Sequence, residues 1–165
     1  MKDAYYSDLE REQMYVETLN YYIHVLLSDK RQHIVFAENS GWNMDHLKEQ
    51  LIDYDSDRLL FISLSPELFD ISKGKGYNEL LMMNMAISDS QVIQDAGGFV
   101  KVTGRYPIYN ILYFVKKATS ALESGKDLYC DVKDHSLYDR LRLGWSGHSF
   151  YSVLYGGRND YYWQK

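Results

Sequence analysis

Apolar residues recur along this chain in two patterns, the spacing of amphipathic helices and short unbroken runs. Ser7 and Glu10 have the spacing of a capping box, and apolar residues then recur at helical intervals, which predicts a helix from about Asp8 to Ser28. Further helices are predicted over residues 44–51, 77–88 and 108–122. Unbroken apolar runs predict buried strands at residues 33–37, 58–64, 99–102 and 128–132. From residue 137 onward the chain is rich in aromatic residues and has no clean period.

This alternation of helices and buried strands is typical of a parallel sheet that is covered by helices on both faces. The sequence therefore predicts the α/β class with a mostly parallel sheet. In such sheets ligands collect at the carboxyl ends of the strands. The segments that follow the predicted strands are therefore the places to look for a site.

The bulk composition narrows the class of protein. A length of 165 residues predicts one domain over residues 1–165. The single cysteine, Cys130, indicates either a reducing compartment or indifference to redox conditions. Residues 1–8 lack the apolar core of a secretory signal, so we expect a cytoplasmic protein. No apolar run approaches the length of a membrane span, and a net charge of -5 argues against a nucleic-acid partner. The net charge does not exclude a local basic pocket that binds a small anion.

Two lysines and two glycines precede the helix predicted at residue 77. Gly74 and Gly76 let a ligand approach the backbone closely, and Lys73 and Lys75 add positive charge. Because the start of a helix attracts phosphate, this segment is a candidate phosphate site, although it lacks the spacing of a P-loop. The alternative is a flexible, solvated basic loop.

A second candidate lies at the end of the strand predicted over residues 99–102. Lys101 belongs to that strand, and Thr103, Gly104, Arg105 and Tyr106 form a glycine turn that carries a guanidinium and a phenol. Arginine binds phosphate or carboxylate through two parallel hydrogen bonds. The alternative is a salt bridge that fixes the turn.

The turn after the first predicted strand is a third candidate. Glu38, Asn39 and Ser40 place short polar side chains at a strand end, where they can bind a base or a ribose. The alternative is an ordinary Asx or Ser turn, which the same residues favour.

Metal binding has little support in the sequence. Residues 53–57 contain two D-x-D triplets, a pattern that holds a divalent cation in many sugar-nucleotide enzymes, but the run precedes a strand instead of ending one. We interpret it as a solvated acidic loop and expect no required cofactor, with a divalent metal left open. The five histidines show no metal-binding spacing. Asp134 and His135 follow a predicted strand and are interpreted as surface residues, with a general-base role as the alternative.

Three sequence blocks occur in this order: IVFAENSG at residues 34–41, KGKGYNE at 73–79 and KVTGRYPIYN at 101–110. Together they resemble a family of bacterial glycosyltransferase-like proteins from lipopolysaccharide and capsule gene clusters. With residues 15–22, the resemblance covers about residues 7–135. This chain departs from the family at Asn78, where the family has glycine, and it lacks the apolar strand with which family members begin.

The resemblance implies a three-layer Rossmann-like sheet of the GT-A class, truncated at its N-terminal strand. It implies binding of a nucleotide-diphosphate sugar and transfer of the sugar to a saccharide acceptor of a surface polysaccharide or lipopolysaccharide. Residues 38–40 would lie near the nucleotide, and residues 73–79 and 101–106 would face the diphosphate and the sugar.

The resemblance also assigns chemical roles. Lys101 and Arg105 stand where metal-dependent members carry D-x-D after a strand, so protein cations would offset the charge of the leaving diphosphate. Glu79 or Asp131 would be the base that takes the proton of the acceptor hydroxyl. The whole hypothesis requires the turns at residues 73–79 and 101–106 to converge at one edge of the sheet.

The rival hypothesis is a non-catalytic binding or assembly module. In that case the missing first strand and the tyrosine-rich tail would form a homodimer or partner interface. Tyr161, Tyr162 and Trp163 would then determine the oligomeric mass.

Overall fold

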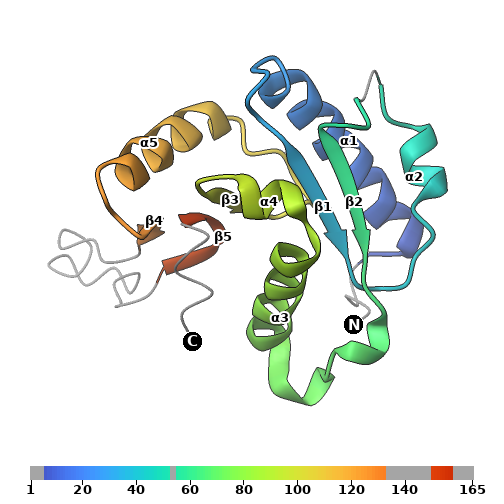
Figure 1. The fold of residues 1–165 in the computed structure, drawn as a ribbon. Coiled ribbons are helices and arrows are strands. Elements are labelled where there is room, and N and C mark those ends of the chain that lie inside the picture. Colours follow the sequence, from blue (N-terminus) through green and yellow to red (C-terminus); the bar gives the residue numbers. More distant parts are fainter. Residues whose placement is uncertain (1–5, 53–54, 133–149, 158–165) are drawn as a thin grey trace, which may run out of the picture. The chain divides into compact units, whose positions relative to one another are not determined.

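The computed structural model describes residues 6–52, 55–132 and 150–157, whose elements Figure 1 labels. The chain forms two compact units. Unit 1 comprises residues 1–95 and 104–109, and unit 2 comprises residues 96–103 and 110–165. The segment of residues 104–109 thus returns to unit 1 after the chain has entered unit 2. The prediction of a single domain stays a prediction.

Unit 1 begins with helix α1 (Asp8–Leu26), whose start follows from its sequence. The Ser7 hydroxyl accepts a hydrogen bond from the backbone N–H of Glu10, and the Glu10 carboxylate accepts one from the backbone N–H of Ser7 at 2.7 Å. This capping box confirms the predicted start of the helix and satisfies two amides that an α-helix leaves without partners.

Two parallel strands form the sheet of unit 1. Strand β1 (Ile34–Glu38) pairs with β2 (Leu59–Ser63), with Ile34 opposite Leu59 and Glu38 opposite Ser63. Helix α2 (Asp45–Glu49) lies between them in the sequence. The hydrophobic core joins α1, both strands and α2 through a set of buried apolar side chains: Val16, Leu19, Ile23, Leu27, Phe36, Met44, Leu47 and Leu59.

After β2 the chain forms two short 3-10 helices, η1 (Pro66–Leu68) and η2 (Ile71–Lys73). Helix α3 (Gly74–Asp89) follows directly and contacts β1, and the short helix α4 (Gln91–Asp95) closes the run. The sequence pattern predicted α3 from residue 77. The helix begins three residues earlier because the two glycines, predicted as a loop, form its first turn.

The described part of unit 2 contains a three-stranded antiparallel sheet and one helix. Strands β3 (Phe99–Val102) and β4 (Leu128–Val132) both pair antiparallel with β5 (Phe150–Gly157), which lies between them. Helix α5 (Ile111–Glu123) ends at a turn in which Gly125 has φ +85°. Glycine is favoured at this position because it adopts a positive φ without strain, and it commonly ends helices in this way.

Two glycines let α5 approach the sheet of unit 2. A Cβ atom placed at Gly156 would lie 2.9 Å from the Ala118 Cβ, and one placed at Gly98 would lie 2.7 Å from a methyl of Leu122. The rings of Phe114 and Tyr129 pack with centroids 5.0 Å apart.

The α/β class is confirmed, but the predicted three-layer Rossmann-like sheet is not. Parallel pairing is found for β1 and β2, whereas β3 and β4 pair antiparallel with β5. Strand β5 was not predicted, because it lies in the aromatic tail that shows no clean period. Consequently the rule that ligands collect at the carboxyl ends of parallel strands applies to β1 and β2 and gives no support to the segments after β3 and β4. Over the described residues, no helix has both the length and the apolar character needed to cross a membrane.

Candidate binding site at the carboxyl ends of β1 and β2

The turn after β1 is stabilised by its own polar side chains. The Glu38 Oε1 atom accepts a hydrogen bond from the backbone N–H of Ser40 at 2.9 Å, and the Ser40 hydroxyl accepts one from the backbone N–H of Trp42 at 3.3 Å. Glu38 and Ser40 thus form the side-chain-stabilised turn that their residue types favour, and their role in binding a nucleotide stays a prediction. Asn39 between them is half-buried.

The loops that follow the two parallel strands touch each other. Gly41 has φ +74°, and a Cβ atom placed there would lie 3.3 Å from the Pro66 ring of η1. Two of the segments that end parallel strands therefore meet at one edge of the sheet in unit 1, as parallel pairing requires.

A small hollow opens beside this turn, and we call it the Trp42 pocket. It offers about 20 Å³, which is room for about one water molecule. Its walls come from α1, β1, the loop after β1 and α2: Asp8, Arg11, Glu12, Tyr15, Phe36, Glu38, Ser40, Trp42, Met44 and Leu47. The hollow admits a single hydroxyl group, and it is too small to enclose a nucleotide.

A buried carboxylate holds one wall of this pocket in place. Glu12 of α1 is only 3 % exposed. Its Oε2 accepts a hydrogen bond from the indole N–H of Trp42 at 2.6 Å, and its Oε1 contacts Nδ1 of His46 and accepts one from the Gln50 amide at 3.0 Å. The loop after β1 and helix α2 are thus tied to α1 through one side chain.

The protonation of Glu12 follows from these contacts. Burial raises the pKa of the carboxyl, but the hydrogen bonds from Trp42, His46 and Gln50 outweigh burial, and the pKa is lowered from its ordinary value of 4.5. The group is therefore an anion at neutral pH. Sequence reasoning missed it, although one signal was present: Glu12 precedes Val16 and Leu19 at the spacing of an apolar helix face.

Arg11 is the one positively charged side chain among the pocket walls that the structure describes. Its guanidinium forms a salt bridge with Asp8, one turn earlier in α1. Burial lowers the pKa of Arg11, but Asp8, Tyr15 and Glu38 raise it further than burial lowers it, so the group stays charged. The buried Nε–H of Arg11 has no hydrogen-bond partner among the residues that the structure describes.

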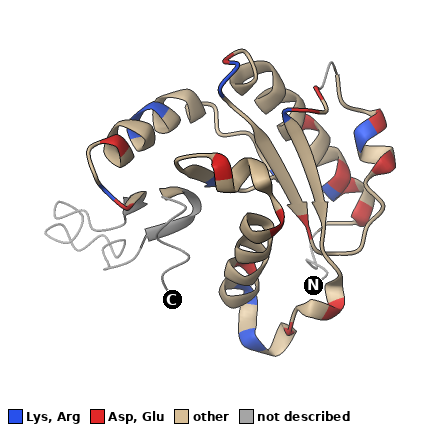
Figure 2. Cartoon of the chain, viewed as in Figure 1, with Lys and Arg blue, Asp and Glu red and all other residues tan. Residues whose placement is uncertain are grey.

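The glycine- and lysine-rich segment forms the end of η2 and the start of α3. Lys73, Gly74, Lys75 and Gly76 are all exposed, and the positive charge stands out at this end of the helix in Figure 2. Among the described residues, none provides a side-chain cap for α3. The Lys73 ammonium lies 4.7 Å from the centre of the Tyr77 ring.

Asn78, where the resembling family has glycine, stabilises this segment. Its side-chain amide donates to the backbone carbonyl of Asp70 at 2.7 Å and to that of Gly74 at 2.9 Å. The asparagine therefore joins η2 to the first turn of α3 and fixes the backbone around the two lysines.

The turn at residues 104–106 belongs to unit 1 and lies against the same elements as the Trp42 pocket. A Cβ atom placed at Gly104 would lie 3.2 Å from the Tyr15 ring and 3.3 Å from the Phe36 ring. Arg105 is half-buried and Tyr106 is exposed. A Cβ atom at residue 104 would therefore require the Tyr15 or Phe36 ring to shift by a few tenths of an ångström.

Two tyrosines of α1 hold the rest of this returning segment. The Tyr22 hydroxyl accepts a hydrogen bond from the backbone N–H of Ile108 at 3.1 Å, and the Tyr21 hydroxyl donates one to the carbonyl of Tyr109 at 2.9 Å. Tyr21 and Tyr22 therefore have a structural role in holding the returning segment against α1.

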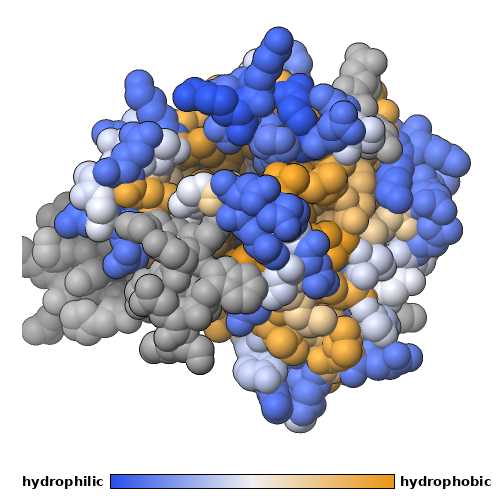
Figure 3. All heavy atoms as spheres, in the orientation of Figure 1, coloured by the Kyte–Doolittle hydropathy of each residue, from blue (hydrophilic) through white to orange (hydrophobic). Residues whose placement is uncertain are grey.

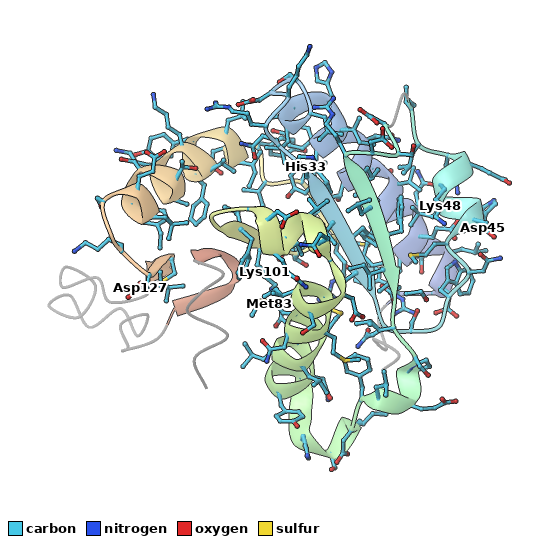
Figure 4. The ribbon with its side chains drawn as sticks, viewed as in Figure 1. His33, Asp45, Lys48, Met83, Lys101 and Asp127 are labelled. Carbon is cyan, nitrogen blue, oxygen red and sulfur yellow. The ribbon has the colours of Figure 1, made fainter. Side chains whose placement is uncertain are left out.

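The remaining predicted site residues lie in other elements. Lys101, labelled in Figure 4, belongs to β3 of unit 2 and pairs with Tyr155. Thr103 directly follows β3 and also belongs to unit 2, and Asp131 lies in β4. Glu79 is half-buried in α3 of unit 1. The structure thus brings Glu38, Ser40 and Gly104 around the Tyr15 and Phe36 rings.

The acidic run at residues 53–57 is described from residue 55 onward. Asp55 accepts a hydrogen bond from the Arg58 guanidinium at 3.0 Å and another from the backbone N–H of Asp57. The described part of the chain contains no cluster of three or more His, Cys, Asp or Glu side chains that would hold a metal ion. Asp53, Asp134, His135 and the predicted tail interface at residues 161–163 lie outside the described residues.

Comparison with known proteins finds no family model, no curated protein and no solved structure that matches this chain.

Proposed function

We propose that this protein binds a nucleotide-diphosphate sugar and transfers the sugar to a saccharide acceptor of a cell-surface polysaccharide or lipopolysaccharide. The observation that carries the proposal is the start of α3. Lys73, Gly74, Lys75 and Gly76 alternate along the chain, are all exposed, and lie at the start of a helix of 16 residues. The first amides of a helix have no partner within the helix and carry a partial positive charge, which favours a phosphate group. The Gly74 N–H donates to the carbonyl of Ile71 in η2, so a phosphate would bind at the amides of Lys75 and Gly76.

The nucleoside would bind beside the turn after β1. Glu38 uses one carboxylate oxygen for the N–H of Ser40, and a carboxylate has about four acceptor positions, so Glu38 can still accept a hydrogen bond from a ribose hydroxyl. Asn39 and Ser40 complete the polar surface there. The contact between Gly41 and Pro66 supports this location, because it joins this turn to the segment that leads into α3.

In the transfer step the oxygen of the acceptor hydroxyl attacks the anomeric carbon. The bond from that carbon to the diphosphate oxygen breaks, and the diphosphate leaves with the electron pair. Lys73, Lys75 and Arg105 would stabilise this charge, and Glu79 would take the proton of the acceptor hydroxyl. The roles of Lys101, Thr103 and Asp131 stay predictions from the resemblance.

Binding is tested by isothermal titration and thermal shift with uridine, cytidine, guanosine and thymidine diphosphate sugars. We expect one nucleotide class to stabilise the wild-type protein. A lysine close to a phosphate contributes about 1 kcal/mol in water, so the double variant Lys73→Ala/Lys75→Ala should bind roughly thirtyfold more weakly. Arg105→Ala should also lose affinity, and added salt should weaken binding by the wild type.

The matched control is Lys116→Ala/Lys117→Ala in α5, which removes the same charge from unit 2. It should bind as the wild type does. The proposal is wrong if millimolar concentrations of every nucleotide class leave the protein unchanged, or if the two double variants lose affinity equally.

One observation favours the alternative, a non-catalytic assembly module. Helix α5 buries Ile111, Phe114 and Ala118 but leaves Leu112 and Tyr113 exposed at 54 % and 61 %. A second copy or a partner could cover these two side chains. Under this alternative, light scattering shows a dimer for the wild type and a lower oligomeric mass for Leu112→Ser. No nucleotide sugar binds to either protein.

A further inference from the structure

Trp42 is an aromatic side chain that is partly exposed and yet fixed. The residue is 38 % exposed, while its indole N–H donates to the buried carboxylate of Glu12 at 2.6 Å. Its backbone N–H is held by the Ser40 hydroxyl, and the nearby Met44 and Leu47 are buried in the core. The polar end of the indole is thus already satisfied by the protein, and the ring is held in one position while part of it meets solvent.

An immobile tryptophan at the surface is suited to stacking. Its large ring buries apolar area, and little side-chain freedom is lost on binding because Glu12 and Ser40 already hold it. Around α3, the exposed side chains of Leu68, Ile71 and Leu80 are aliphatic, and hydrophobic surface is visible there in Figure 3. The exposed ring of Tyr77 in α3 lies beside the Lys73 ammonium, at 4.7 Å, instead of a carboxylate.

The charge of the Trp42 pocket selects the kind of ligand. Among the lining residues that the structure describes, Asp8, Glu12 and Glu38 oppose the single positive charge of Arg11, so these walls carry a net charge of about -2 at neutral pH. A diphosphate would be repelled here, whereas neutral hydroxyl groups can donate hydrogen bonds to the carboxylates. The hollow of about 20 Å³ fits one such hydroxyl.

We propose that Trp42 and the Trp42 pocket form a saccharide-binding site. A sugar ring stacks on the Trp42 indole, and one of its hydroxyl groups enters the pocket and donates a hydrogen bond to Glu38 or Asp8. This site shares Glu38 with the nucleoside position of the proposed function, and it goes beyond that function because it needs no phosphate and does not involve Lys73 or Lys75. The ring belongs either to a neutral saccharide or to the ribose of a nucleoside, which share this chemistry.

The experiment uses the full chain and probes without phosphate. One arm titrates glucose, galactose, mannose, N-acetylglucosamine and rhamnose, and the other titrates uridine, cytidine, guanosine and thymidine. Binding is followed by tryptophan fluorescence and by calorimetry. The chain has three tryptophans, so a fluorescence change that reports Trp42 must disappear in Trp42→Phe. Saccharide binding in the first arm identifies a neutral sugar as the ligand, and binding only in the second identifies the ribose.

We expect Trp42→Ala to weaken binding by at least about tenfold, since a stacked aromatic ring contributes up to about 1.5 kcal/mol beyond its buried area. Trp42→Phe keeps a ring and should keep most of the affinity, which separates stacking from a failure to fold. Tyr113→Ala removes another exposed aromatic ring and should bind as the wild type does.

Three outcomes overturn the proposal. The first is that no probe binds at tens of millimolar, and the second is that Trp42→Ala binds as tightly as the wild type. The third is that choline binds while every sugar fails, because the site would then recognise a cation through its aromatic and acidic walls. The Lys73→Ala/Lys75→Ala variant should bind the neutral probes normally, so failure of the phosphate site leaves this test unaffected.

Discussion

Replacing Glu12 by glutamine tests whether one carboxylate holds the loop after β1 and helix α2 against α1. The carboxylate receives the Trp42 indole N–H on Oε2, and the His46 ring and the Gln50 amide on Oε1. Glutamine has the same shape but only one oxygen. In either orientation of the amide, its NH₂ group faces a donor from which the carboxylate accepts a hydrogen bond in the wild type.

The magnitude follows from the least costly orientation. If the oxygen of the new amide keeps the contacts with His46 and Gln50, the hydrogen bond from Trp42 is lost. A hydrogen bond to a charged group contributes about 1.5–3 kcal/mol to the stability of a protein. Water can replace part of this loss, because Trp42 is 38 % exposed and the His46 side chain is 66 % exposed. We therefore expect Glu12→Gln to lower the free energy of unfolding by about 2 kcal/mol.

Urea unfolding followed by circular dichroism measures this change, with Glu17→Gln as the matched control. Glu17 is an exposed residue of the same helix, so its substitution should change the free energy by less than about 0.5 kcal/mol. Because two units can unfold in separate steps, hydrogen exchange of the α1 amides should locate the loss in unit 1. Equal stability of the Glu12 variant and the wild type at neutral pH would refute the reasoning.

The pH dependence provides a second test of the same prediction. Since the folded-state pKa of Glu12 lies below its ordinary value of 4.5, its stabilising effect is fully present above that value and is lost as the pH falls through the folded-state pKa. Glutamine does not titrate. The stability difference between wild type and variant should therefore shrink in acid, and a difference that grows in acid would contradict an ionised Glu12.

Two further substitutions test the packing around the candidate site and in unit 2. Tyr22→Phe removes the acceptor for the Ile108 amide and should cost about 1 kcal/mol, with faster hydrogen exchange at that amide; unchanged exchange would contradict the bond. Gly156→Ala should destabilise unit 2 by about 1–3 kcal/mol in thermal unfolding, because the new Cβ would lie 2.9 Å from Ala118. Adding Ala118→Gly should restore part of the lost stability. If the double variant loses as much stability as the two single variants together, this contact is not the cause.

Local patterns in the sequence predicted the elements because the information for each lies within a few residues. The Ser7 and Glu10 capping box is a contact between neighbours and starts α1 as predicted. Strands β3 and β4 have the predicted bounds, since an unbroken apolar run is itself the signal for a buried strand. The start of α3 was misjudged because glycine lowers helix propensity, whereas here Asn78 binds the carbonyls of Asp70 and Gly74 and fixes the turn.

Strand pairing was harder to predict because it depends on partners that are distant along the chain. An apolar run indicates a buried strand in a parallel or an antiparallel sheet, and nothing in residues 99–102 or 128–132 distinguishes the two. The partner that decides the matter is β5, which contains Gly156 and Gly157 where a strand pattern favours branched or aromatic residues. Gly156 leaves room for α5, which packs closely on the sheet there, and no local pattern reveals this close approach.

The candidate site shows the same division between local and distant information. The turn at Glu38 and Ser40 is visible in the sequence because it forms among neighbours, but the wall of the Trp42 pocket depends on a contact across 30 residues. A glutamate in a helix is ordinarily assigned to the solvent face. Glu12, however, shares its face with Val16 and Leu19, and a charge in such a stripe must be buried with partners or the helix would not pack there. The conflict between its charge and its position is therefore the sequence signal for this site, and it indicates that donors must come from elsewhere in the chain without identifying Trp42, His46 or Gln50.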